Sequence, residues 1–182
     1  MLEKVLEPLQ KAGWNTEYVQ VGDKKILGCR ACNQCFAKQD KRCVFNNDIF
    51  NEVFAKMLAA DAIILGSPTY FAGVGSELKG LMDRAGYVAI ANGRAFRGKI
   101  GAGVVAVRRG GATHVFDTIN HMFLMSEMIV PGSLYWNMGY GLHEKDVLSD
   151  QEGLNNMRHL GETIHWLGSA IQPDRAGPPP GP

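Results

Sequence analysis

The stretch ADAIILGSPTYFAGVGSELKGLMDR, residues 60–84, decides the fold class of this chain. It opens with the run AIILG (62–66), whose continuous apolar character is typical of a strand buried on both faces of a parallel sheet. A loop containing Pro68 and two glycines follows, and then an expected helix at about 76–88. Open α/β sheets bind ligands in loops beyond the carboxyl ends of their strands, so this loop is the first candidate site.

Helices and apolar strands alternate along the rest of the chain, which predicts one domain built on an open, doubly wound, parallel α/β sheet. The domain is expected to cover residues 1–171, with a cysteine-rich insertion at 28–46 and a disordered tail at 172–182. Ser149 and Glu152 predict a capping box at the start of the last helix. The other predicted elements are a helix ending before Gly13, a strand at 16–21, a helix capped by Asn47 or Asp48, a strand at 99–107, a helix at 114–127 and a strand within 129–136.

The loop after residues 62–66 carries side chains suited to a planar ligand. Ser67 and Thr69 bring hydroxyl groups, and Tyr70 and Phe71 bring flat apolar faces. This combination fits a heteroaromatic ligand with a polar edge. The alternative is a plain strand-to-helix turn whose aromatic side chains fold into the core.

The next strand ends in RRGGATH (108–114), at the neighbouring carboxyl end. Gly110 and Gly111 expose backbone N–H groups at a helix start, where the helix dipole favours an anion or a carbonyl edge, and Arg109 adds a fixed charge. The ordinary alternative is a helix N-terminus beside a solvated arginine. Because the two loops follow adjacent strands, we expect them to line one crevice.

All the cysteines of the chain lie in one short segment, as Cys29, Cys32, Cys35 and Cys43. The spacing C-x2-C-x2-C-x7-C suits a 4Fe-4S cluster, because three thiolates from a tight loop and a fourth from close by can each bind one iron. Free or redox-active thiols are one alternative. Zinc is another, although zinc sites more often use two separated C-x2-C pairs or add histidine, and no histidine lies near this segment.

From Gly28 to about Ile171 the chain resembles the flavodoxin-like NAD(P)H-dependent FMN reductases, and within them the iron-sulfur flavoproteins, which carry a compact cysteine motif of this kind. The resemblance rests on the cysteine motif, on residues 60–84 and on LSDQEGLNNMRHLGETI (148–164). It implies that the loop from Ser67 to Gly73 binds FMN. The residues it assigns to the ribityl chain and isoalloxazine are Ser67, Pro68, Thr69, Tyr70, Phe71 and Ala72, and those it assigns to the pyrimidine edge are Arg109, Gly110 and Gly111.

One part of the family pattern is not found. In flavodoxin-like proteins a central first strand precedes the first helix, and its loop cradles the FMN phosphate. This chain begins inside that helix, so we expect the usual first strand to be lacking and the sequence to be an N-terminal truncation. Segments 16–21 and 62–66 would then flank a vacancy in the sheet, and Arg108 and Arg109 are the alternative phosphate ligands.

Composition narrows the functional classes. The chain has 182 residues, 46% of them hydrophobic, and a formal net charge of +1, which disfavours nucleic-acid binding. No apolar run approaches the ~18 residues of a membrane span, and the N-terminal segment does not have the pattern of a signal peptide. We therefore expect a cytoplasmic protein that binds neither nucleic acid nor membrane.

The sequence predicts an FMN-dependent oxidoreductase with a 4Fe-4S cluster, which transfers electrons between NAD(P)H or a ferredoxin-type carrier and an acceptor. NAD(P)H is a possible reductant although no G-x-G-x-x-G follows a strand. One alternative is a cluster-free NAD(P)H-dependent FMN or quinone reductase, and another is a non-catalytic, zinc-stabilised binding module. A homodimer or homotetramer is expected because Tyr135, Trp136, Tyr140 and FLMSEMIV (123–130) offer apolar surface, for which core burial is the other explanation.

Overall fold

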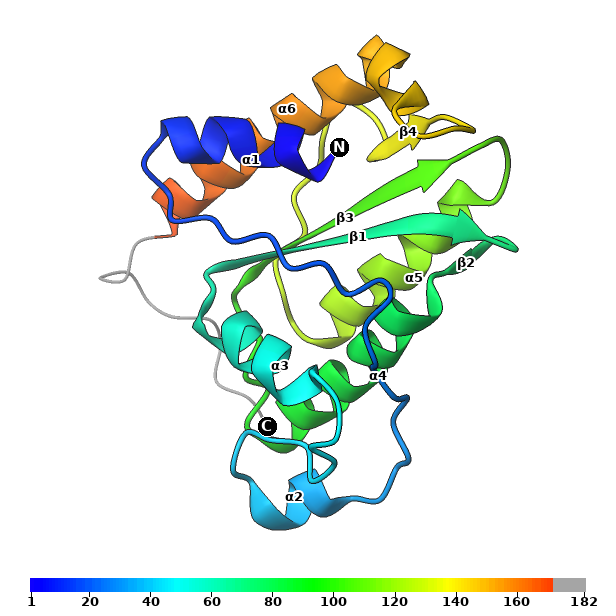
Figure 1. The fold of residues 1–182 in the computed structure, drawn as a ribbon. Coiled ribbons are helices and arrows are strands. Elements are labelled where there is room, and N and C mark those ends of the chain that lie inside the picture. Colours follow the sequence, from blue (N-terminus) through cyan, green and yellow to red (C-terminus); the bar gives the residue numbers. More distant parts are fainter. Residues whose placement is uncertain (172–182) are drawn as a thin grey trace.

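A computed structural model describes residues 1–171 and shows a four-stranded sheet between two layers of helices (Figure 1). The strand order is β2-β1-β3-β4, in which β1, β3 and β4 run parallel, so the predicted α/β class is confirmed. The tail predicted at 172–182 lies outside the described residues. The elements are α1 (Leu2–Lys11), α2 (Gln34–Lys38), α3 (Phe50–Ala59), β1 (Ala62–Tyr70), β2 (Gly73–Val74), α4 (Ser76–Ala91), β3 (Ile100–Val107), α5 (Ala112–Met125), β4 (Met138–Tyr140), a 3-10 helix (Asp146–Ser149) and α6 (Gln151–Ala170).

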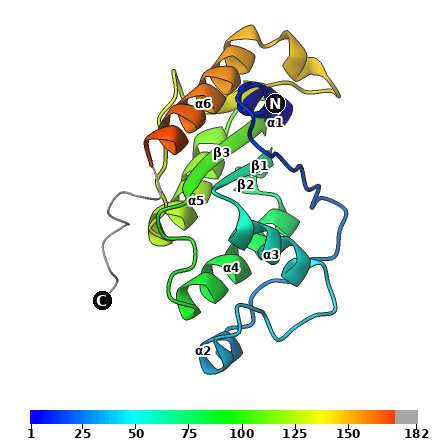
Figure 2. The ribbon, with the colours of Figure 1, turned by 90° about the vertical axis from the view of Figure 1, so that its left-hand side faces the viewer.

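The central strands are covered on both faces, as the apolar run 62–66 predicts. Ile63 and Leu65 of β1 pack in the core under α3, α4 and α5, whereas Ala62 and Ile64 pack on the opposite side with α1 and α6. Figure 2 shows these two helical layers with the sheet between them. Alternate residues of a strand point to opposite faces, so a strand that is apolar at every position needs both covers.

The strand predicted at 16–21 is wrong. The segment has no regular secondary structure, although Val19 and Val21 still pack against the core beneath α3 and α4. Strand β1 pairs with β3 through seven consecutive residues, but within residues 1–171 its other edge pairs only with β2, at Thr69 and Tyr70. An isolated extended segment cannot form a ladder without a neighbouring strand, and no such neighbour lies beside 16–21 in the described part of the chain.

The strand predicted within 129–136 is also misplaced. Only Ile129 forms a bridge there, to Ile100, and the strand that extends the sheet is β4, which begins at Met138. The reason lies in Asn156, a buried side chain of α6 whose amide oxygen accepts the Tyr135 N–H and whose amide nitrogen donates to the carbonyls of Tyr135 and Trp136. These backbone groups are therefore not free to join the sheet.

Two helix starts differ from the predicted caps. Asp150 caps α6 in place of Ser149, because its carboxylate accepts the Gly153 N–H at 2.9 Å. Asp48 accepts the Phe50 N–H at the start of α3, but its other oxygen binds the side chain of Arg84.

Within the described residues, no helix is long and apolar enough to cross a membrane.

The contact between α1 and α6 depends on a missing side chain at Gly161. A Cβ added there would lie 2.2 Å from the Val5 carbonyl oxygen and 2.5 Å from the Pro8 ring. We expect Gly161→Ala to lower the free energy of unfolding by about 1–3 kcal/mol, because backbone cannot move aside as a flexible side chain can. Denaturant unfolding followed by circular dichroism measures the change.

Gly86 in α4 provides the matched control, since a Cβ added there meets no atom within 4 Å. Gly86→Ala should raise stability by up to about 1 kcal/mol through its higher helix propensity. Equal effects of the two substitutions would contradict the packing explanation.

Candidate functional site

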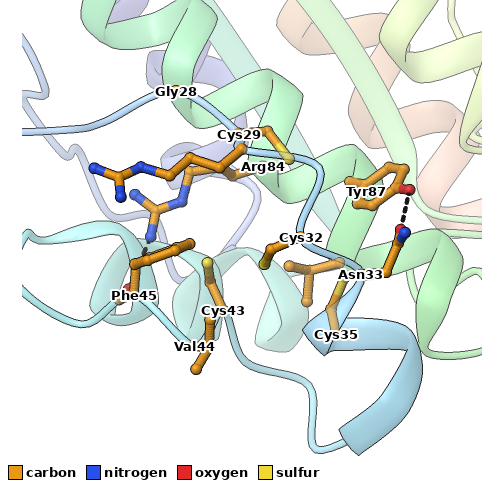
Figure 3. A pocket seen from close by; sticks show the side chains of 12 residues that line it. Gly28, Cys29, Cys32, Asn33, Cys35, Cys43, Val44, Phe45, Arg84 and Tyr87 are labelled. Carbon is orange, nitrogen blue, oxygen red and sulfur yellow. Dashed lines mark hydrogen bonds between the residues drawn. The ribbon is translucent and has the colours of Figure 1, made fainter.

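The four cysteines line one pocket, which we call the cysteine pocket. It lies between the loop of residues 28–45 and helix α4, at the end of the molecule where α2 protrudes (Figures 1 and 3). Cys35 is buried, Cys43 is half-buried, and Cys29 and Cys32 are exposed. The structure therefore brings the whole predicted metal set together, and adds Arg30, Asn33, Phe45, Arg84 and Tyr87 to the walls.

The loop of residues 28–45, which we call the cysteine loop, makes a tight turn with residues whose backbone lies in the left-handed region of φ/ψ space. Ala31 and Asn33 have φ values of 49° and 59°, and the Cys29 sulfur accepts the Ala31 N–H at 3.4 Å. The Asn33 side chain accepts a 2.6 Å hydrogen bond from the hydroxyl of Tyr87, which projects from α4 (Figure 3). Such backbone conformations are unfavourable for residues other than glycine. They persist where surrounding contacts impose them, often at functional sites.

A buried ion pair holds the cysteine loop on the body of the protein. The guanidinium of Arg84 in α4 binds the Asp48 carboxylate, and both side chains are almost fully removed from solvent. Arg84 also donates to the carbonyls of Leu27, at 3.2 Å, and Phe45, at 2.9 Å. One side chain thus binds the chain just before Cys29 and just after Cys43.

The pKa of Asp48 reflects this setting. Burial has the largest influence and would raise the pKa, but the Leu27 N–H, the Arg84 guanidinium and the Phe50 N–H all bind the carboxylate. Together these bonds lower the pKa of Asp48 below its ordinary value. The carboxylate therefore stays ionised in the folded protein, which an ion pair with Arg84 requires.

The thiols surround a space and do not converge on one point. Within residues 1–171, no three Cys, His, Asp or Glu side chains are placed to bind a single metal ion. A mononuclear zinc site needs sulfurs about 2.3 Å from one ion, whereas each cysteine of a cubane binds a different iron and the sulfurs stand farther apart. Burial raises the pKa of Cys35, and the neighbouring thiols of Cys29 and Cys32 raise it further.

The other predicted loop forms a tight hairpin. Thr69 pairs with Val74 and Tyr70 with Gly73, and the two residues of the turn, Phe71 and Ala72, both have positive φ. This is the pattern of a type I′ turn, which normally selects asparagine and glycine, so the sequence did not reveal it. Two residues held in an unfavourable conformation at the carboxyl end of β1 mark the turn as a candidate binding element.

The predicted residues of this hairpin have different roles. Ser67 is buried, and its hydroxyl is used inside the hairpin, where it donates to the Pro68 carbonyl and accepts the Gly75 N–H. Tyr70 and Phe71 are exposed, which contradicts the alternative that these aromatic rings fold into the core.

The glycine loop after β3 lies directly against the hairpin. A Cβ added to Gly111, which has φ of 90°, would lie 2.8 Å from Ala72 and 3.3 Å from the Thr69 methyl group. The Thr69 hydroxyl is buried there without a hydrogen-bond partner among the described residues. Arg109 is exposed beside this contact, and α5 begins immediately after Gly111. The two predicted loops therefore share one edge of the sheet, as their positions in the sequence imply.

Sequence reasoning did not assign several residues of these sites. Arg84 and Asp48 are far apart in the chain and carry no motif of their own, and Tyr87 shares only its helical face with Arg84, three residues before it. Tyr140 ends β4 opposite Val107, so it lies at the same carboxyl edge as the hairpin and is exposed. Tyr135 and Trp136 are exposed too, so core burial does not explain these aromatic residues, whereas Phe123 and Met128 of the predicted surface 123–130 are buried in the core.

Comparison with known proteins agrees with the fold. Residues 1–143 match the NADPH-dependent FMN reductase family. The chain belongs to this family. It is therefore an oxidoreductase of the NADPH-dependent FMN reductase type, and the family resemblance noted in the sequence is confirmed.

The chain is similar to several iron-sulfur flavoproteins. One from Methanocaldococcus jannaschii is 36% identical over 171 residues, which cover 90% of this chain and 86% of the relative. An iron-sulfur flavoprotein of Methanosarcina thermophila is 32% identical over 166 residues, covering 89% and 85%. Homology to such proteins implies FMN and an iron-sulfur cluster as cofactors of this kind of chain.

Solved structures of low sequence identity show the fold. RosB, determined with a bound riboflavin-phosphate intermediate, superposes with a TM-score of 0.72 at 16% identity, covering 95% of this chain and 72% of RosB. The Trp repressor binding protein from Bacillus subtilis gives 0.64 at 17% identity, covering 87% and 88%. The fold is flavodoxin-like, as predicted.

The hydrogen bond between Tyr87 and Asn33 generates a test of how the cysteine loop is held. Tyr87→Phe removes the hydroxyl and keeps the ring, which stacks edge-on against Phe36 at 5.1 Å. Losing about 1 kcal/mol of local stabilisation should speed amide exchange of residues 30–35 roughly fivefold. Hydrogen exchange followed by mass spectrometry measures this, and exchange in β3 should stay unchanged.

Proposed function

We propose that this protein is an FMN-dependent oxidoreductase with a 4Fe-4S cluster, which transfers electrons between NAD(P)H or a ferredoxin-type carrier and an acceptor. The observation that carries the proposal is the cysteine pocket, because every thiol of the chain faces one cavity although the motif spans residues 29–43. The proposal that FMN binds rests on the hairpin and the glycine loop, which lie together at the carboxyl edge of the sheet.

The residues at the carboxyl edge fit FMN. Thr69 offers a buried hydroxyl without a partner in the described structure, and α5 offers the free N–H groups of its first turn beside Gly111. Arg109 supplies positive charge next to them. Bound FMN supplies the hydride and electron chemistry, so the protein needs to provide only position, charge and exclusion of water.

The exposed aromatic residues, of which the family resemblance assigns Tyr70 and Phe71 to the flavin, are also the proposed contacts of the substrate. Tyr70 and Phe71 on the hairpin and Tyr140 on β4 lie at the carboxyl edge of the sheet and remain open to solvent. Flat side chains of this kind can stack on a nicotinamide, a quinone-like acceptor or the surface of a second subunit. We propose a homodimer or homotetramer that uses the exposed apolar residues 134–136, in a reducing compartment such as the cytoplasm.

Helix α4 connects the two proposed cofactor sites. It begins at Ser76, with only Gly75 between it and the hairpin, and it places Arg84 in the wall of the cysteine pocket. Eight residues of α-helix separate these positions by about 12 Å. Both sites are thus fixed on one rigid element of the same chain, which suits an electron path between flavin and cluster.

Absorbance of protein purified without oxygen tests the proposal. We expect flavin bands together with a broad brown shoulder, and about four iron atoms per chain. Flavin bands without iron would leave a cluster-free reductase, and absence of both would leave the zinc-stabilised module. Cys35→Ser should remove most of the iron and the broad shoulder while the flavin bands persist, since Cys35 is not on the hairpin.

Substitutions in the glycine loop test the flavin site. Gly111→Ala places a methyl group against Ala72 and forces alanine into a positive φ, so it should push the two loops apart and weaken FMN binding at least tenfold. Gly86→Ala is the matched control, because no atom lies within 4 Å of its added Cβ and Gly86 lies in α4, outside both predicted loops. Quenching of flavin fluorescence on binding measures both, and equal affinities would move the flavin away from this loop.

A further inference from the structure

Arg84 has a donor that its structural role does not use. Only 2% of its side chain is exposed, and its two terminal nitrogens bind Asp48, Leu27 and Phe45. Its Nε–H is buried and has no hydrogen-bond partner among the described residues. A buried N–H without a partner costs free energy, so it points to an acceptor that the polypeptide itself does not supply.

The ion pair is oriented with its positive end toward the cysteines. Arg84 lines the cysteine pocket, whereas Asp48 lies behind it and is not part of the lining. Figure 3 draws Arg84 among the residues that line the pocket, with a dashed line from its guanidinium to the Phe45 carbonyl. The Phe50 ring packs on the guanidinium of Arg84, whose Cζ lies 4.0 Å from the ring centre. This contact closes one face of the guanidinium against water.

We propose that Arg84 is a positioning and potential-setting residue for the cluster, whose Nε–H donates a hydrogen bond to a sulfur in the cysteine pocket. The inference rests on the proposed 4Fe-4S cluster. A cluster held by four thiolates is an anion, and uptake of one electron from the reductant, NAD(P)H through flavin or a ferredoxin-type carrier, adds one negative charge without a proton. A fixed positive group at the wall favours the more negative form and therefore raises the reduction potential.

The same geometry distinguishes this role from a purely mechanical one. If Arg84 only ties Leu27 to Phe45, its replacement changes how much cluster is held but not its potential. If the charge acts on the cluster, removing the positive partner and removing the negative partner must shift the potential in opposite directions. Asp48→Asn suits this purpose, because it removes the negative charge while its one amide oxygen can still accept the Leu27 N–H; the Phe50 N–H, which binds the other carboxylate oxygen, loses its acceptor.

The experiment is an anaerobic redox titration of the iron-loaded protein, followed by electron paramagnetic resonance, with iron and sulfide counted per chain. Arg84→Gln should lower the ratio of reduced to oxidised cluster about tenfold at the wild-type midpoint, a shift of about 59 mV for one electron. Asp48→Asn should raise that ratio. Arg30→Gln is the matched control, because Arg30 also lines the pocket but is exposed, and solvent should keep its effect below about threefold.

The outcomes separate the two claims. Wild-type protein that binds no iron refutes the proposed function itself. If iron is bound, an Arg84→Gln midpoint equal to wild type, or a shift no larger than that of Arg30→Gln, overturns the inference. If Arg84→Gln cannot hold the cluster, Asp48→Asn decides: a higher midpoint supports the role of the arginine, and an unchanged or lower one overturns it.

Discussion

The parallel pairing of β1 with β3 is the constraint on which the other features depend. Seven residue pairs, from Ala62 with Ile100 to Pro68 with Ala106, join two strands that are covered on both faces. Because the pairing is in register along its whole length, both strands end at the same edge, and the loops that follow them must meet. The contact between Ala72 and Gly111 is the direct result.

Helix α4 links the edge of the sheet to the cysteine loop. Its start is fixed by the hairpin, its inner face by the core, and its outer residues Arg84 and Tyr87 by the cysteine loop. The cysteine loop contains only the five-residue helix α2 as regular structure, so side chains of α4 and of the segment just before α3 must hold it. Arg84 and Asp48 do so at the cost of burying two charges, which their mutual attraction and their bonds to the backbone of Leu27, Phe45 and Phe50 offset.

Two features of the structure carry the proposed cofactor sites. One is the turn in which Phe71 and Ala72 both have positive φ angles, which stability alone does not require. The other is the set of four cysteines that line one pocket. Neither site is formed by a single segment, since each joins a loop to residues from another part of the chain.

Local patterns in the sequence were enough for the α/β class, for the strands at 62–66 and 99–107 and for the grouping of the cysteines, because burial on both faces and short ligand spacing leave marks within a few residues. They failed where a distant partner decides the outcome. Residues 16–21 have the composition of a strand but no neighbour to pair with in the described chain, and Asn156 takes the backbone groups of residues 135–136 away from the sheet. Arg84 and Asp48 were likewise invisible, because a buried ion pair between residues 36 positions apart exists only once α3 and α4 have packed together. The sequence determined which residues could form strands and ligands, and tertiary packing decided which of them found a partner.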